Sequence, residues 1–89
     1  IYIPNTFTPG GEDDRNPVFQ AYGGNIKTFE MLIFNRWGEL IYTFDDFLDS
    51  WDGNYNGVEC QDGTYIWKAT FTDLTDEEHT MTGHINLLR

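Results

Sequence analysis

Apolar and polar residues alternate along several short stretches of the chain, and a period of two is typical of half-buried β-strands. The clearest stretch is residues 64–73, TYIWKATFTD, whose apolar face carries Tyr65, Trp67, Ala69 and Phe71. The opposite face is mostly polar. The pattern therefore predicts a strand with one face in the core and the other in solvent.

Residues 79–88, HTMTGHINLL, alternate in the same way and place Met81, Gly83, Ile85 and Leu87 on one face. The segment between this stretch and the previous one is acidic and polar. We therefore predict that the two stretches pair as an antiparallel hairpin.

Residues 28–35, TFEMLIFN, are apolar on both faces, which predicts a central strand or one whose outer face is covered. Residues 39–44, ELIYTF, follow directly and should pair with them. The corner NRWG, residues 35–38, joins the two runs, and its glycine supplies the positive φ that a tight turn requires.

Two shorter strands are predicted near the N-terminus, at residues 2–7 and 18–22. Pro4 and Pro9 confine the first to a sheet edge, because proline has no N–H to donate to a ladder. No stretch predicts a long helix, and only residues 45–53 favour a single short helical turn.

The chain thus contains about seven short antiparallel strands, with turn signals every roughly 8–12 residues. This pattern predicts an all-β fold, an immunoglobulin-like β-sandwich. The 89 residues are predicted to form one domain, residues 1–89. Seven Phe, five Tyr and three Trp supply the large apolar surface that so small a core needs.

The formal net charge of −10 narrows the classes of partner. Nucleic acid and anionic membrane surfaces would be repelled, whereas cations and basic proteins would be attracted. No stretch approaches the about 20 apolar residues of a membrane helix, so we predict no membrane insertion.

Catalytic chemistry is not predicted. Cys60 is the only cysteine, so no internal disulfide can form, and its neighbour Glu59 is acidic, whereas reactive thiols favour an electropositive setting. Ser50 is the only serine, and neither a nucleophile elbow nor a phosphate loop is present. His79 and His84 fall on opposite strand faces and match no transition-metal spacing. We predict that the chain is not an enzyme.

Four segments in order have a recognisable pattern: PNTFTPGGEDDRNPVF (4–19), IFNRWGELIY (33–42), WDGNYNGVECQDGTYIW (51–67) and TGHINLLR (82–89). Together they resemble the gliding motility-associated C-terminal domain, also called the type B sorting domain of the type IX secretion system. The matching positions, implied to be structural, are Pro4, Asn5, Phe7, Asn35, Arg36, Trp37, Gly38, Trp51, Asp52, Gly53, Gly57, Gly63, Tyr65 and Gly83.

The resemblance implies an immunoglobulin-like sandwich and a non-catalytic role. Such domains end larger secreted proteins, often adhesins or cell-surface enzymes, and direct them through the outer-membrane type IX translocon. A PorP/SprF-like outer-membrane partner is implied, with a final location outside the cell or on its surface. The alternative from another class is a generic extracellular immunoglobulin-like module for adhesion or carbohydrate binding.

The loop GGEDDRN is one residue longer than the family's and loses its Asn-Gly pattern, but it keeps three carboxylates. Glu12, Asp13, Asp14 and Asn16 offer oxygen ligands of the kind that Ca²⁺ prefers. The complete calcium-loop pattern is absent. Two interpretations stay open for this loop, a Ca²⁺ site and a solvated turn, and no other cofactor is expected.

A second acidic cluster contains Asp45, Asp46, Asp49 and Asp52. Three of these carboxylates would share one face if the segment were helical, which favours either a cation or a solvated loop. Asp52 belongs to the WDG turn, where it can accept a backbone hydrogen bond as an Asx turn or pair with Arg36.

The conspicuous residues of segment 51–65, WDGNYNGVECQDGTY, are predicted to have structural roles. Trp51 is predicted to anchor the core. The Asp-Gly, Asn-Gly and Asp-Gly pairs that follow are turn signals, and the middle pair has the type I′ signature.

The surface that the translocon recognises has two candidates. One is an exposed edge strand that could pair with a partner strand. The other is the C-terminal strand, from which the predicted contact residues are Leu87, Leu88 and Arg89. Arg36 and Trp37 of the corner are predicted either to build the turn, with the Trp37 ring lying over the end of the sandwich, or to contact the translocon directly.

Overall fold

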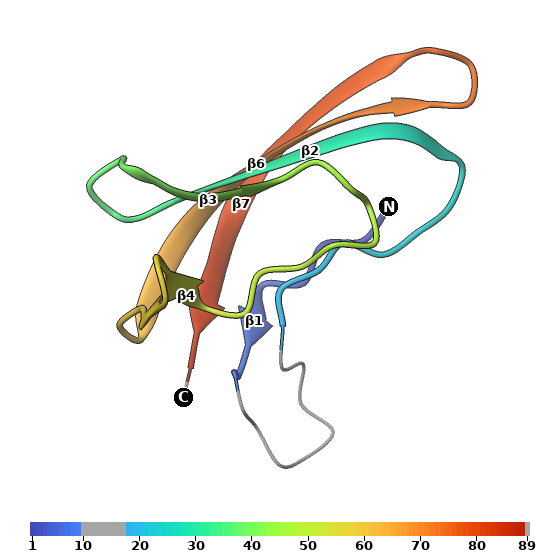
Figure 1. The fold of residues 1–89 in the computed structure, drawn as a ribbon. Coiled ribbons are helices and arrows are strands. Elements are labelled where there is room, and N and C mark those ends of the chain that lie inside the picture. The colour runs from blue at the N-terminus through green and yellow to red at the C-terminus, as the bar shows by residue number, and fades with distance from the viewer. Residues whose placement is uncertain (10–17, 89) are drawn as a thin grey trace.

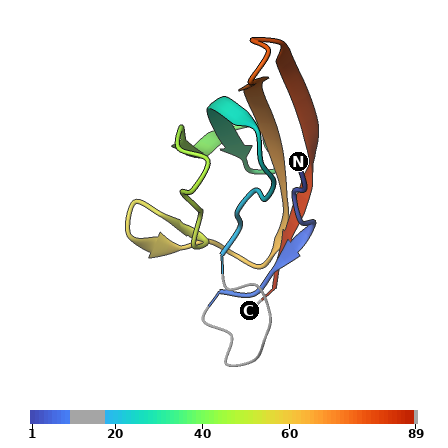
Figure 2. The same ribbon diagram turned by 90° about the vertical axis from the view of Figure 1, so that its right-hand side faces the viewer.

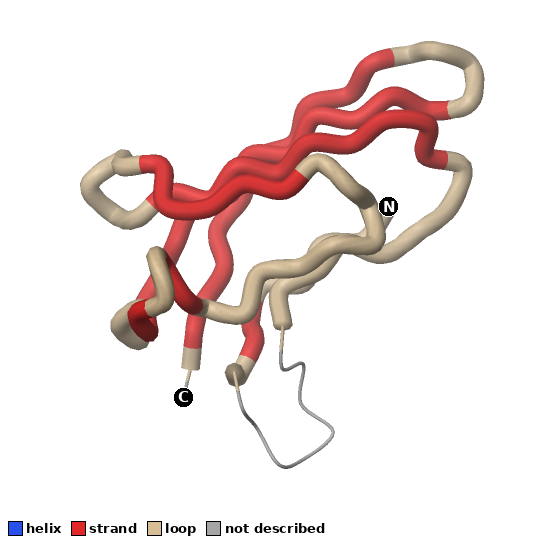
Figure 3. Tube along the Cα trace, in the orientation of Figure 1, coloured by secondary structure: helices blue, strands red, loops and turns tan. Residues whose placement is uncertain are grey.

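The computed structural model describes residues 1–9 and 18–88. Within these ranges the chain forms strands and no helix, as Figures 1 and 3 show. The all-β fold class predicted from the alternation is confirmed. The strands are β1 (Thr6–Phe7), β2 (Ile26–Phe34), β3 (Leu40–Phe44), β4 (Asn54–Tyr55), β5 (Val58–Glu59), β6 (Gly63–Asp73) and β7 (Glu78–Leu87).

A five-stranded sheet in the order β1-β7-β6-β2-β3 forms the main layer. β6 and β7 pair as the predicted antiparallel hairpin, with Tyr65 opposite Ile85. β2 lies between β6 and β3, which confirms its predicted central position. Figures 1 and 2 show the β6–β7 hairpin projecting beyond the rest of the molecule.

One strand pair differs from the predicted antiparallel arrangement. β1 pairs with β7 in parallel, and Phe7 lies opposite Leu87. The backbone N–H of Leu88 donates to the carbonyl of Phe7 at 3.0 Å. This pairing holds the N-terminal segment at a sheet edge, as Pro4 predicted, but in the same direction as the last strand.

The second layer is built from extended segments instead of continuous strands, and Figure 1 shows them below the main sheet. Tyr2 bridges to Tyr22 and Phe19 bridges to Trp51, both antiparallel. The predicted strands at 2–7 and 18–22 are therefore shorter than expected. Residues 18–22 divide their hydrogen bonds between two different partners, so no long ladder forms with either.

The core lies between the two layers and is strongly aromatic. Every second residue of β6 from Tyr65 to Phe71 is buried, as the alternation predicted. Ile85 and Leu87 of β7 are fully buried, but Met81 is 36% exposed because the hairpin projects beyond the second layer. The other large, fully buried side chains are Phe7, Phe19, Met31, Ile33 and Trp51.

No helical segment with the length and hydropathy needed to cross a bilayer occurs in residues 1–9 and 18–88.

Candidate functional site

The NRWG corner between β2 and β3 is organised by the side chain of Asn35. Its Oδ1 accepts hydrogen bonds from the backbone N–H of Trp37 at 2.9 Å and of Glu39 at 3.0 Å. Its Nδ2 donates to Oε1 of Glu39 at 2.9 Å. Gly38 has φ +84°, and its N–H donates to the carbonyl of Asn35 at 3.0 Å. The corner is therefore rigid, and the predicted role of Gly38 is confirmed.

This rigid corner presents Arg36 and Trp37 to solvent. Trp37 is 73% exposed, so the prediction that its ring lies over the end of the sandwich is wrong. The Arg36 Cζ lies 4.7 Å from the centre of the Trp37 ring, a cation–π contact. Because the turn geometry is already fixed by Asn35, the Trp37 indole is not needed as an anchor.

The predicted ion pair between Arg36 and Asp52 does not form. The Asp52 carboxylate instead accepts from the backbone N–H of Asn54 at 3.1 Å and from Asn54 Nδ2 at 3.3 Å. This is the Asx turn that the sequence offered as the other possibility. A local hydrogen bond two residues away costs less ordering entropy than a pair between distant side chains.

The WDG segment behaves as predicted. Trp51 is fully buried, and its indole N–H donates to the carbonyl of Asn54 at 2.9 Å. Asn56 and Gly57 have φ +53° and +79°, the two positive values of a type I′ turn, and they join β4 to β5. Trp51 thus fixes the start of this hairpin against the core.

The two motif segments meet at a cavity of about 250 Å³, here called the corner pocket. One wall comes from the NRWG corner and the start of β3, and the other from the β4–β5 hairpin and the start of β6. The lining residues are Asn35, Arg36, Trp37, Ile41, Tyr55, Cys60, Gln61, Asp62, Gly63, Thr64 and Tyr65. Sequence analysis missed this pocket, although both walls carry family motifs.

The chemistry of the corner pocket suits binding. The pocket mixes aromatic rings with amide, hydroxyl, carboxylate and guanidinium groups, and the Tyr65 hydroxyl donates to the carbonyl of Gln61 at 2.7 Å. The described lining residues include no histidine. Cys60 is half-buried and lies in the wall. Such a recess can accept a polar or aromatic side chain of a partner protein.

The second acidic cluster forms local turns. Asp46 Oδ1 accepts from the N–H of Leu48 at 2.9 Å, and Asp49 Oδ1 accepts from the N–H of Ser50 at 2.8 Å. The segment is not helical, so the shared helical face considered for these carboxylates is wrong. These aspartates cap turns that carry the chain from β3 to the second layer.

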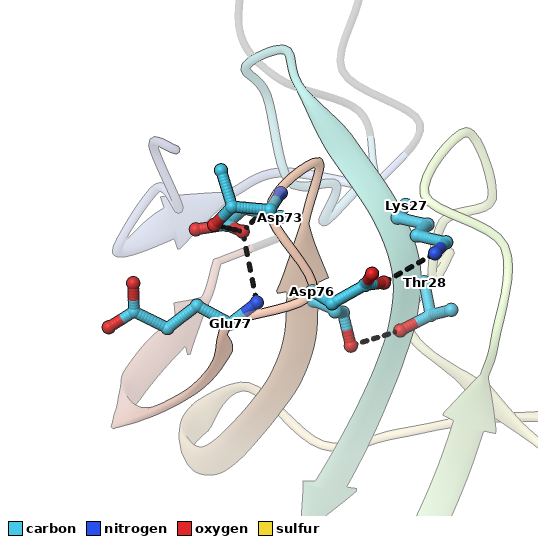
Figure 4. A network of polar contacts seen from close by, with 7 residues as sticks. Lys27, Thr28, Asp73, Asp76 and Glu77 are labelled. Atoms are coloured by element: carbon cyan, nitrogen blue, oxygen red, sulfur yellow. Dashed lines mark hydrogen bonds and ion pairs between the residues drawn. The ribbon is translucent and has the colours of Figure 1, made fainter.

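The tip of the β6–β7 hairpin contains a network around Asp73, drawn in Figure 4. Asp73 Oδ1 accepts from the Thr75 hydroxyl at 2.6 Å and from the Thr75 and Glu77 backbone N–H groups at 2.8 and 3.1 Å. Its Oδ2 lies 3.0 Å from His79 Nε2. Beside this network, Lys27 of β2 pairs with Asp76. Asp73 therefore holds the turn in shape.

Asp73, Glu77 and His79 are also a group whose possible metal ligand atoms lie within 4.8 Å of one another. Residues separated by four and then two positions meet here because the chain reverses between β6 and β7. Both Asp73 oxygens already accept hydrogen bonds from the turn, so we interpret the group as part of the hairpin. In the sequence, the signal for this group is the spacing of Asp73, Glu77 and His79 across the predicted hairpin turn.

Acidification is expected to loosen this turn. Hydrogen bonds from the Thr75 hydroxyl and the His79 ring, followed by backbone N–H groups, hold the pKa of Asp73 well below its usual range. Since the folded-state pKa is depressed, the stabilisation is complete above the unfolded value of about 3.9 and is lost as the pH falls further. The backbone N–H resonances of Thr75 and Glu77 should therefore titrate with a midpoint well below pH 4.

The measurement is an NMR pH titration of the intact domain, with Asp73→Asn as the matched control. That variant should abolish the titration at both amides. A midpoint near the ordinary carboxyl value in the parent would contradict the expectation.

The remaining predicted site residues lie in three places. Leu87 is 0% exposed and faces the core, so the prediction that it contacts a partner directly is wrong for the folded domain. Leu88 is 50% exposed and is available for contact. Arg89 lies outside the described residues. Glu12, Asp13, Asp14 and Asn16 lie there too, so Ca²⁺ binding by their loop stays a prediction.

Comparison with known protein families gives a match that spans nearly the whole chain. Residues 1–87 match the CHU_C type IX secretion signal domain. Neither the curated proteins nor the solved structures contain a significant match.

Proposed function

The chain belongs to the CHU_C family of type IX secretion signal domains, and from that premise we propose that its NRWG corner and corner pocket form the surface by which the secretion machinery recognises it. A type IX secretion signal interacts with the type IX machinery, and the protein that carries it is exported from the cell. A sorting signal is a non-catalytic kind of domain. The family match over residues 1–87 is the observation that carries this function.

The geometry of the corner supports recognition at this place. Asn35 and Gly38 fix the turn without the Trp37 indole, and Trp37 remains 73% exposed with Arg36 stacked on it. Tryptophan and arginine are the residues most enriched among those that dominate protein–protein binding energies. An exposed tryptophan on a rigid turn also loses little conformational freedom on binding.

The finer points of the function are part of the same proposal. The recognising partner is an outer-membrane protein of the PorP/SprF kind, and the exported protein remains at the cell surface, as adhesins and surface enzymes do. The domain itself carries no enzymatic activity. Its acidic surface favours a partner with a basic docking face, because the net charge is −10.

Export of a reporter tests the proposal. A periplasmic reporter fused to residues 1–89 should appear outside a host with type IX secretion, and the same reporter without these residues should stay in the periplasm. Trp37→Ala should lower export strongly, because it removes the exposed ring of the corner. The measurement is the extracellular fraction of the reporter.

Leu48→Ala is the matched control, because Leu48 is 79% exposed and does not line the corner pocket. This variant should export as the parent does. Equal export with and without residues 1–89 would refute the sorting function, and equal export by Trp37→Ala and the parent would refute recognition at the corner.

A further inference from the structure

The main sheet ends in an open edge, formed by the side of β3 that faces away from β2 and here called the β3 edge. β3 is the last strand in the sheet order, and its neighbour in the ladder is β2. No backbone hydrogen bond joins Leu40–Phe44 to any other described segment. In an antiparallel pair, every second residue directs its N–H and C=O away from the partner strand. The β3 edge therefore presents backbone donors and acceptors to solvent.

The β3 edge carries few of the devices that normally keep edge strands from pairing. Its ladder with β2 is irregular at one place, where Ile41 has no partner in the register, and it is regular from Tyr42 to Phe44. Natural edges carry lysines, prolines or inward-pointing charges, or they are very short. The strand Leu40–Phe44, LIYTF, contains none of these residues. The opposite edge of the sheet is better protected, because β1 has only two residues and follows Pro4.

The side chains of β3 divide between core and solvent. Ile41 and Phe44 are buried and hold the strand in place, while Leu40 and Thr43 are exposed. Ile41 also lines the corner pocket. An added strand would thus pass directly beside the pocket and the exposed Trp37 ring.

Carboxylates stand at both ends of the β3 edge. Glu39 precedes the strand, and Asp45 and Asp46 follow it. Burial, followed by the charges of Asp49 and Asp52, raises the pKa of Tyr42, so these two carboxylates lie close enough to act on the Tyr42 hydroxyl. A segment that pairs here meets carboxylates near both of its ends.

We propose that the β3 edge accepts an extended segment of a type IX secretion component as an added strand, with Lys or Arg at the ends of that segment. This inference rests on the proposed function and names the chemistry of its partner. Backbone hydrogen bonds supply affinity in this mode, and the flanking charges supply selectivity.

The charges also decide against a second copy of the chain as the occupant. Antiparallel pairing of two β3 edges places Glu39 of one copy near Asp45 and Asp46 of the other. Each copy in addition carries a net charge of −10. Like charges that face each other across an interface are strongly unfavourable.

Two synthetic peptides test the inference on the purified domain: KTVTVTK and the matched ETVTVTE. KTVTVTK should slow hydrogen exchange at the amides of β3 that face away from β2, as followed by NMR, and ETVTVTE should not. Thr43→Lys should weaken binding of KTVTVTK about fivefold, the factor for one like-charge contact at about 4 Å in water. Thr80→Lys, the same exposed change on β7, should leave binding unaltered.

Resonance shifts without slower exchange at β3 would show only diffuse binding to acidic groups and would overturn the inference. Concentration-dependent self-association through β3 would overturn the choice of occupant. In cells, Thr43→Lys should lower reporter export and Thr80→Lys should not. Equal export by both variants would refute the β3 edge and leave the sorting function standing. Failure of the unmodified domain to export would refute the sorting function, while the peptides would still decide the edge.

Discussion

Trp51→Ala is expected to lower the free energy of unfolding by about 3–5 kcal/mol, the usual cost of deleting a buried tryptophan side chain. Trp51 is 0% exposed, and its ring centre lies 5.4 Å from that of Phe7 and 5.3 Å from that of Tyr65. Its indole N–H also fixes the carbonyl of Asn54. The substitution therefore leaves a cavity between the two layers and releases the β4–β5 hairpin from the core.

Urea unfolding at 25 °C followed by circular dichroism measures this loss. A small domain has a total stability of about 5–15 kcal/mol, so the variant should lie close to unfolding even without urea. Trp37→Ala is the matched control, since Trp37 is 73% exposed and its loss should change stability by no more than about 0.5 kcal/mol. An equal loss from both substitutions would show that Trp51 is not the anchor.

Gly83→Ala is expected to destabilise the domain by about 1–3 kcal/mol, because it overpacks a filled part of the core. A Cβ at this position would lie 2.6 Å from Cζ2 and 2.8 Å from Cε2 of Trp67. Trp67 is the cross-strand partner of Gly83, and its ring is only 6% exposed. The rigid ring cannot move away without displacing its neighbours.

Thermal unfolding gives the clearest readout, since each kcal/mol lowers the melting temperature of a domain this size by about 4–8 °C. Gly24→Ala is the control, because a Cβ there meets nothing within 4 Å and its loop has room. That variant should have the same stability as the parent or a slightly higher one, because alanine lowers the conformational entropy of the unfolded chain. A second control, Gly83→Ala combined with Trp67→Phe, should recover part of the loss. An unchanged melting temperature for Gly83→Ala would mean that the Trp67 ring does not rest on Gly83.

Gly83 also shows why the role of a motif residue is hard to interpret from sequence. The alternation placed Gly83 on the core face of its strand, where a glycine has no side chain to bury. The structure explains the choice, because the Trp67 indole fills the space that a side chain would occupy. The glycine serves close packing between strands and not a turn.

The sequence by itself determined the elements whose cause is local. Alternation predicted β6 and its buried face, and the corner glycine and the Asn-Gly pair predicted turns with the observed positive φ values at Gly38, Asn56 and Gly57. It also determined the family, because the motifs are read in order along the chain. Strand period and turn chemistry depend on neighbouring residues, so they can be read without knowing what lies across the core.

Only the tertiary structure decided which motif tryptophan is buried and which is exposed to solvent. Trp51 and Trp37 are both motif tryptophans beside a turn, yet one is fully buried and the other is 73% exposed. The parallel β1–β7 pair, the corner pocket and the open β3 edge likewise depend on segments distant in sequence. Which of two similar motif side chains is buried, and which sheet edge stays open, is set by the distant segments that pack there. The local patterns around Trp37 and Trp51 do not contain that information.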